Sequence, residues 1–491
     1  MDEGVLVISD IHLGEDVLTS GPEHLSVYIR SLNRELAGFV RAHGTPISEG
    51  RQWHLIVNGD MFDFVKVSIQ PSAEEAFERW SRELSEDERL RLPNTPENVV
   101  WKLTRIMEIH RPLFRELARF LLVGHRVTIV EGNHDAELYF PEVRETLIQG
   151  LVAEARKLVR REDELARYDP EELGTRMLFR PWFVASAGRY HVEHGHQYDE
   201  YCSFEYNLVP YDRRDAVELA TPMSHRLLPY FSELLGDFST HGVDTWGVGK
   251  WIRFAFSLGP RMLWALSRGY AQAMWELLGQ AGRKREKELR ELDKVHRVRL
   301  EELAQQSRYG FETLYNLFEN RAKPAEFSLL KMMRVFYLDR FLVGIVALVA
   351  ALGAFVVGGV GILVGGGVLA LAGLTLWVLS ATKHRAIHVT LREAAARVAD
   401  ETGARFVVFG HSHKPEVVNL AAEYGVGRFG EEAYYINGGS WVTREILQGE
   451  HGNGMTYVEI SSEGATLKAW TGEGSEPRVL GRARASSSST E

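Results

Sequence analysis

Acidic, histidine and asparagine residues follow short apolar runs in this chain, directly where each run ends. The stretch Leu-Ile-Val-Asn-Gly-Asp-Met-Phe-Asp, residues 55–63, places Asp60 at the tip of a turn. An acidic residue just past the end of a buried strand lies where α/β folds place their chemistry. Taken alone, this stretch is more simply a surface turn, because Gly-Asp pairs are common in turns.

Four other apolar runs end in the same kind of residue. They are followed by Asp10-Ile11-His12, Glu131-Gly132-Asn133-His134-Asp135, His194-Gly195-His196 and Gly410-His411-Ser412-His413. Side chains alternate along an extended chain, so the outer two members of each Asp-x-His or His-x-His triplet face the same way. Carboxylates, imidazoles and amide oxygens are ligands of divalent metal ions. Five such clusters at strand ends predict a metal centre.

These motifs resemble, in the same order, those of the calcineurin-like metallophosphoesterase family. The resemblance covers residues 1–200 and 400–472 and also includes the pair Gly59-Asp60 with Asp63. It implies an α/β fold with a β-sandwich flanked by helices and two divalent metal ions at the strand ends. Within the family, the Gly-Asp-Met-Phe-Asp and His-Gly-His-Gln-Tyr-Asp stretches look most like homologues of UDP-2,3-diacylglucosamine pyrophosphatase, which cleave a lipid-linked diphosphate at the membrane. The position of His196 and the large insertion depart from that group.

The resemblance also implies the metal ligands. One ion would be held by Asp10, His12, Asp60 and His413, and the other by Asp60, Asn133, His194 and His411. Two cations about 3.5–4 Å apart clamp phosphoryl oxygens and activate water, and such a pair needs one shared anionic ligand. A carboxylate suits that bridging role better than a neutral imidazole, which agrees with the place of Asp60. We expect Mn²⁺, with iron or zinc as alternatives, because affinity order alone does not select the metal.

Further roles follow for the residues around the ligands. By the same resemblance, His134, with Asp135 behind it, would contact the phosphate and protonate the leaving oxygen. Asp63 and Asp199 are better interpreted as groups that orient histidines than as ligands. His196 has three open interpretations: it touches substrate, it touches a metal-bound water, or it lines the rim.

Length and charge narrow the class of protein. A chain of 491 residues suggests two or more domains. The net charge of −10 argues against a general nucleic-acid binder. The single cysteine, Cys202, excludes an internal disulfide and fits a reducing compartment. Met-Asp-Glu-Gly runs directly into a predicted strand, so no cleavable signal peptide is expected.

The first 200 residues alternate between strand and helix patterns, which is typical of an α/β domain. Amphipathic helices are expected at residues 23–43, 99–122 and 143–165, and the acidic stretch 70–98 is interpreted as a solvated insertion or lid. After His413, strands are expected at residues 433–436, 455–460 and 465–470. Asn437–Trp441 resembles the turn after the last histidines of the family, with an ordinary Gly-rich loop as the alternative.

Residues 341–380 carry no charged side chain, which is enough chain for two membrane spans of about 20 residues. Gly358, Gly359 and Gly361 indicate a reversal at its middle. The alternatives are one long buried helix and a re-entrant hairpin. The predicted organisation is a metallophosphoesterase domain in two parts, residues 1–200 and 381–472, a helical insertion at 201–340 rich in tryptophan between 246 and 275, a transmembrane hairpin at 341–380, and a disordered tail at 473–491.

Topology agrees with an even number of membrane crossings. His194 precedes the hairpin and His411 follows it, yet both are expected to bind one metal ion. Basic residues flank both ends of the hairpin, which places both ends in the cytoplasm. They are Lys331, Arg334 and Arg340 before it, and Lys383 and Arg385 after it. The catalytic domain is therefore expected on the cytoplasmic face of the cell inner membrane.

Three functions are compatible with these patterns. The leading one is a membrane-anchored two-metal phosphoesterase that hydrolyses a phosphoester or pyrophosphate bond in a lipid-linked substrate. The second is a nucleotide or cyclic-nucleotide phosphodiesterase whose hairpin is only an anchor. The third is a non-catalytic membrane scaffold, which the full set of ligand residues disfavours. The expected partners are the lipid-linked substrate and the membrane, with no nucleic acid.

Overall fold

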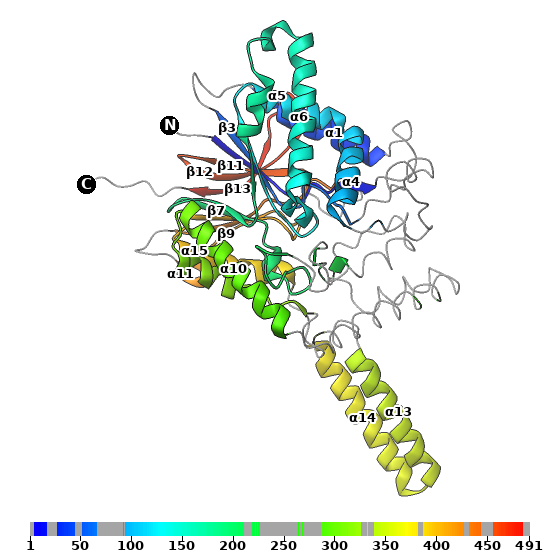
Figure 1. The fold of residues 1–491 in the computed structure, drawn as a ribbon. Helices are drawn as coiled ribbons and strands as arrows, with labels where there is room; N and C mark the ends of the chain where they lie inside the picture. The colour runs from blue at the N-terminus through cyan, green and yellow to red at the C-terminus, as the bar shows by residue number, and fades with distance from the viewer. Residues whose placement is uncertain are drawn as a thin grey trace, which may run out of the picture. The chain divides into compact units, whose positions relative to one another are not determined.

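A computed structural model of the chain describes most of the residues that carry the predicted chemistry (Figure 1). The described residues are 4–16, 27–44, 52–65, 92, 94–210, 219–220, 222, 224–225, 264, 268, 286–325, 331, 338–381, 386–426, 432–442 and 455–484. Most of the acidic stretch 70–98 and of the Trp-rich segment 246–275 lies outside them. The chain divides into two compact units. The first comprises Met1–His225, Glu286–Ala322 and Thr390–Glu491, and the second comprises Arg226–Arg285 and Lys323–Val389.

Two mixed β-sheets form the centre of the first unit, so the α/β class is confirmed. The seven-stranded sheet has the order β13-β12-β11-β1-β3-β4-β5, and the five-stranded sheet has the order β6-β7-β8-β10-β9. The larger sheet contains β1 (Gly4–Ile8), β3 (Trp53–Asn58), β4 (Arg126–Val130), β5 (Met177–Arg180), β11 (Thr456–Ser461), β12 (Gly464–Ala469) and β13 (Arg478–Arg484). The smaller contains β6 (Phe183–Ser186), β7 (Tyr190–Glu193), β8 (Phe406–Phe409), β9 (Glu416–Asn419) and β10 (Tyr434–Asn437), while β2 (Leu13–Asp16) lies outside both.

The middle strands of each sheet are parallel, and this decides where the loops meet. In the larger sheet β1, β3, β4 and β5 run in one direction. In the smaller sheet β7, β8 and β10 run in one direction. The segments that follow these strands therefore leave from a common edge of each sheet, which is where open α/β sheets place their ligands.

The two sheets share one apolar core. Val5 and Val7 of β1 contact the cluster that includes Val192, Phe406 and Val408 of the smaller sheet. The alternate residues of β1, Leu6 and Ile8, face the other way and pack with the helices. Side chains alternate along a strand, so β1 is apolar on both faces because both of its faces are covered.

Helices cover the outer face of the larger sheet, and α10, α11 and α15 lie beside the smaller one (Figure 1). The helices of this unit are α1 (Val27–Ala42), α4 (Pro96–Ile109), α5 (Arg111–Leu122), α6 (Pro141–Arg161), α7 (Leu173–Arg176), α10 (Glu286–Gln306), α11 (Phe311–Glu319), α15 (Ile387–Thr402) and α16 (Leu420–Tyr424). The helix predicted at residues 23–43 is confirmed as α1 over its described part, and the helix predicted at 143–165 as α6.

Two predictions about secondary structure were wrong. The single helix expected at residues 99–122 is two helices that meet at His110. Pro112 lies in the first turn of α5, where its missing N–H costs little, whereas inside one long helix it would break the ladder. The tail expected to be disordered contains β13, which pairs with β12. Its composition resembles that of disordered segments, but the neighbouring strand offers it a sheet edge; residues 485–491 lie outside the described part.

The second unit contains a helical hairpin, α13 (Leu338–Val357) and α14 (Val360–Ala381). The chain reverses at Gly358 and Gly359, whose φ angles of 66° and 53° suit glycine. The predicted reversal is confirmed, and the alternative of one long helix was wrong. Within the described residues, no helix has both the length and the apolar character needed to cross a membrane. The hairpin itself is established, and its predicted membrane crossing is not supported.

Candidate metal centre

The five predicted clusters come together at the carboxyl ends of strands in both sheets. Asp10, Asp60 and Asn133 follow β1, β3 and β4 of the larger sheet, and His194 and His411 follow β7 and β8 of the smaller one. All predicted ligands are buried except His411, which is half-buried. A set of buried carboxylates and imidazoles would be costly unless its members bind one another or a cation.

The ligand residues have unusual backbone conformations. Among the described non-glycine residues, positive φ angles occur at Asp10, His12, Asp60, His411 and His413, with values between 52° and 65°. Each of these five was predicted from sequence to bind metal. L-residues avoid this region, and each instance costs on the order of 1–3 kcal/mol, which folds retain mainly at functional sites. The backbone strain is therefore evidence, independent of the sequence motifs, that these five residues belong to a functional site.

The first group of candidate ligands contains Asp10, His12 and His413. One ligand atom of each lies within 4.8 Å of the others, and Asp10 Oδ1 is 3.3 Å from His413 Nε2. The turn after β10 supports this group, because the Trp441 N–H donates to the carbonyl of Asp10 at 3.0 Å. Asn437 Nδ2 donates to the carbonyl of Gly410 at 2.7 Å. The turn at residues 437–441 is thus hydrogen-bonded to the segments that follow β1 and β8, which an ordinary hairpin loop would not be.

The second group contains Asp60, His194 and His411, whose ligand atoms also lie within 4.8 Å of one another. Asp60 Oδ2 is 3.1 Å from His194 Nε2 and 3.7 Å from His12 Nε2. Asn133 Oδ1 is 3.2 Å from the same His194 Nε2. Asp60 is the residue whose single carboxylate oxygen faces histidines of both groups.

The electrostatics of this centre favour a cation. Burial opposes ionisation of Asp60, but His194, His134 and His12 outweigh it and hold the pKa of this carboxyl well below its ordinary value. Burial likewise opposes protonation of His194, yet Asp60 and Asp10 outweigh it and raise its pKa to about 9. Against the effect of its burial, nearby histidines also lower the pKa of Asp10. Asp10 and Asp60 therefore place negative charge in the buried centre, which a divalent ion would neutralise.

Hydrogen bonds fix the ring orientations of the histidines. His194 Nδ1 donates to the carbonyl of Asn58 at 2.9 Å, so its Nε2 is the atom that faces Asp60. His12 Nδ1 is hydrogen-bonded to Asp63 Oδ2 at 3.2 Å. The same oxygen lies 3.2 Å from His134 Nδ1, as a close contact without hydrogen-bond geometry. Asp199 Oδ2 is 3.0 Å from His411 Nε2. Asp63 and Asp199 therefore lie against histidines, as orienting groups should.

Asp135 has a different place from the one predicted. Its carboxylate accepts backbone N–H groups of Gly132 and Met61, each at 2.7 Å, and of Phe62 at 3.3 Å. Burial and the nearby Asp60 raise its pKa to about 7, although these N–H groups oppose the rise. Asp135 ties the loop after β4 to the loop after β3, and the carboxylate beside the His134 ring belongs to Asp63. The predicted pairing of His134 with Asp135 was wrong, because the Asp135 oxygens accept backbone N–H groups and the carboxylate near the His134 ring is that of Asp63.

His196 and His225 complete the surroundings of the second group. The ring of His196 is 5.4 Å from that of His194, and its Nε2 is 2.8 Å from Gln197 Nε2. It is buried, which disfavours a place on an open rim. His225 lies 4.3 Å from the His134 ring, centroid to centroid, and was missed by the sequence analysis. It is one of three histidines in the insertion, and none of the three belongs to an Asp-x-His or His-x-His motif, so no motif or spacing could have identified it.

Close approach of the loops depends on glycine at two positions. Gly59 has a φ of 78°, and an added Cβ would lie 2.4 Å from the His194 ring. An added Cβ at Gly132 would lie 2.1 Å from Asp60 Oδ1 and 2.5 Å from the Asp60 backbone nitrogen. The loops after β3 and β4 can therefore meet only because these positions carry no side chain.

Gly132→Ala is expected to lower the melting temperature and to weaken metal binding. The added methyl group would meet both the buried Asp60 carboxylate and the Asp60 backbone nitrogen, and such overpacking costs about 1–3 kcal/mol. Gly310→Ala is the matched control, because Gly310 has a φ of −70° and no atom lies within 4 Å of its added Cβ. Thermal unfolding and Mn²⁺ titration would test this, and equal results for the two variants would contradict the packing argument.

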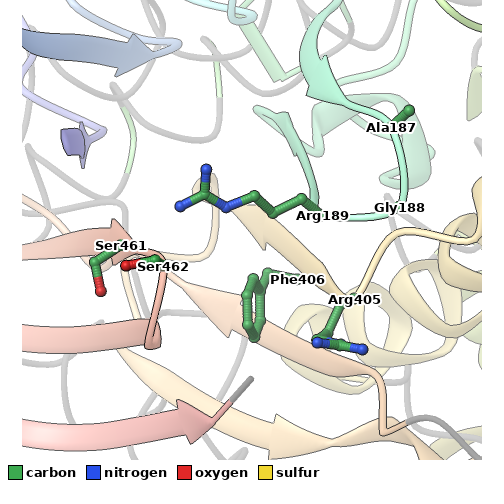
Figure 2. A pocket seen from close by; sticks show the side chains of 7 residues that line it. All are labelled: Ala187, Gly188, Arg189, Arg405, Phe406, Ser461 and Ser462. Atoms are coloured by element: carbon green, nitrogen blue, oxygen red, sulfur yellow. The ribbon is translucent and has the colours of Figure 1, made fainter. Parts of the chain in front are cut away.

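A separate cavity of about 360 Å³ lies at the opposite ends of β7 and β8 (Figure 2). Arg189 and Arg405 line it directly before these strands begin, with Phe406, Ser461 and Ser462 also at its wall. His194 and His411 follow the other ends of the same strands. The cavity is therefore distinct from the metal centre and contains none of its candidate ligands.

Comparison with known proteins assigns no family to this arrangement. No protein-family model matches the chain, and no curated protein matches it significantly.

Proposed function

We propose that this chain is a two-metal phosphoesterase that hydrolyses a phosphoester or pyrophosphate bond. The observation that carries the proposal is the shared position of Asp60, whose Oδ2 faces His194 at 3.1 Å and His12 at 3.7 Å. One carboxylate between two groups of ligands is the arrangement that a pair of ions requires. The calcineurin-like resemblance of the motifs supports the same reading.

The donor set fits divalent ions of the manganese, iron and zinc type. Buried carboxylates, imidazoles and an amide oxygen converge without any thiolate in the Asp10 or Asp60 groups. Asp10, His12, Asp60 and His413 would hold one ion, and Asp60, Asn133, His194 and His411 the other. Bound there, two ions would supply Lewis acidity toward the phosphoryl group and its attacking water.

His134 is the group best placed to act on the leaving oxygen. Its backbone N–H donates to Asp60 Oδ1 at 2.9 Å, which fixes the loop beside the shared ligand. Asp63 Oδ2 lies 3.2 Å from its Nδ1, on the side of the ring away from Nε2. The opposite nitrogen, Nε2, can then face a substrate and donate a proton to the departing group.

We further propose that the substrate is lipid-linked and that the hairpin α13–α14 inserts into the apolar part of the cytoplasmic membrane. The described part of the hairpin exposes large apolar side chains, including Val349, Val356, Leu363 and Leu371, with Val356 88% exposed. Water-soluble proteins rarely expose continuous apolar surface of this kind. Lipid is the solvent that such a surface suits, and a bilayer also presents acylated phosphates.

The choice between a lipid-linked substrate and a soluble nucleotide can be tested by comparing hydrolysis rates. Purified protein with Mn²⁺ should hydrolyse an acylated nucleotide-sugar diphosphate in mixed micelles at least about tenfold faster than the deacylated compound, because acyl-chain binding orients the phosphate. Nucleotides and cyclic nucleotides form the comparison panel. Equal turnover of acylated and deacylated compounds would contradict the lipid assignment and favour the nucleotide phosphodiesterase.

A hairpin deletion separates anchoring from catalysis. The variant that joins residue 340 to 381 through a short linker should leave the membrane fraction, while the intact protein should stay there through an alkaline wash. The first unit contains all the candidate ligands, so the deletion should retain metal binding. Release of the intact protein by salt alone would contradict membrane insertion.

A further inference from the structure

We propose that His225 is a positioning residue that holds the Asn133 side-chain amide with its oxygen toward the second metal group. The inference rests on the proposed two-metal function and adds to it a residue from the insertion. His225 is 3% exposed and lies within the same compact unit as the ligands. Its Nε2 is 3.2 Å from Asn133 Nδ2.

The need for such a residue comes from the chemistry of asparagine. The two ends of the amide have nearly the same shape, but only the oxygen can bind a cation. Asn133 Oδ1 is 3.2 Å from His194 Nε2, so in this orientation the oxygen faces the metal group. The NH₂ end can only donate, and the partner that it meets is His225 Nε2. With His225 in the tautomer that leaves Nε2 unprotonated, a flip would place the amide oxygen against the lone pair of that nitrogen and the NH₂ against the cation.

The segment that carries His225 is tied to the loop after β7. The Ser224 N–H donates to the carbonyl of Tyr201 at 3.0 Å, and Cys202 Sγ donates to Ser224 Oγ at 3.3 Å. The His225 N–H donates to the carbonyl of Pro222 at 3.0 Å. These contacts fix the backbone of residues 224–225 and so position the His225 ring. The orientation of Asn133 therefore depends on a segment outside the five ligand motifs.

The ring of His225 also contacts His134, with an angle of 51° between the ring planes. Removal of the His225 imidazole would therefore disturb His134 as well as the Asn133 amide. For this reason, the affinity for metal is the measurement that isolates the proposed role, because Asn133 is a proposed ligand and His134 is not.

The test compares His225→Leu with His225→Gln by calorimetric titration with Mn²⁺. Leucine cannot accept a hydrogen bond from Asn133, whereas the glutamine side-chain oxygen can. We expect His225→Leu to weaken one of two Mn²⁺ sites about 10–100-fold, the range for loss of an orienting partner, and to leave the other unchanged. His225→Gln should restore most of the affinity. Wild-type affinity in His225→Leu, or equal losses in both variants, would overturn the proposal.

An Asn133→Asp background provides the control that excludes a general packing defect. A carboxylate at position 133 has two equivalent oxygens, so its orientation needs no fixing. Adding His225→Leu there should cause no further loss of Mn²⁺ affinity, and an undiminished loss would mean that His225 acts only through packing. Failure of the wild type to bind two ions would contradict the proposed function itself, which the same titration reports separately.

Discussion

Asp60→Asn is expected to abolish binding of both metal ions and with it all turnover above background. Its Oδ2 faces His194 and His12, so the substitution removes the shared anionic ligand of both groups at once. It also removes the charge that raises the pKa of His194. Affinity should fall by well over the roughly 10–100-fold that loss of an orienting partner causes. Elemental analysis of protein dialysed against limiting Mn²⁺ would measure the loss.

The matched control for this experiment is Asp400→Asn. Asp400 is an exposed carboxylate on α15 of the same unit, and none of the candidate metal-ligand groups contains it. The control should bind two ions and retain full activity. Two ions bound by Asp60→Asn would contradict the bridging role, and one ion would assign the carboxylate to a single group.

His134→Ala is expected to keep both ions and to lower kcat by about 10²–10⁴-fold, the usual contribution of a general acid. His134 is not among the proposed ligands, its Nδ1 lies 3.2 Å from Asp63 Oδ2, and the hydrogen bond from its backbone N–H to Asp60 survives the substitution. The loss should be large for an alkyl phosphodiester and small for a nitrophenyl ester, because a good leaving group departs without a proton.

The dependence on leaving group is what distinguishes acid catalysis from binding. If His134 only binds the phosphate, His134→Ala should lower kcat/KM by the same factor for both esters and should raise KM for both. An equal loss for good and poor leaving groups would rule out the proton-transfer role.

The sequence by itself determined which residues meet and at which ends of the strands. Three local patterns carry this information: the apolar runs, the alternation of side chains along a strand, and the glycines beside Asp60 and Asn133. Local patterns of this kind can be read directly from the sequence. For the same reason the reversal at Gly358 and Gly359 was predictable. The helix break at His110 was also readable in principle from Pro112, whereas β13 depended on an edge that a strand far away in the sequence supplies.

Only the tertiary structure decided how the clustered residues divide their tasks. Asp63 comes three residues after Asp60 and Asp135 two after Asn133, yet Asp63 lies against His12 and His134 while Asp135 binds three backbone N–H groups. The left-handed backbone at five candidate ligands and the contact of His225 with Asn133 likewise arise where separate loops are forced together. Sequence spacing records the distance along one strand or turn. It carries no information about which side of a turn meets a loop from another sheet, and that contact is what assigns each side chain its role.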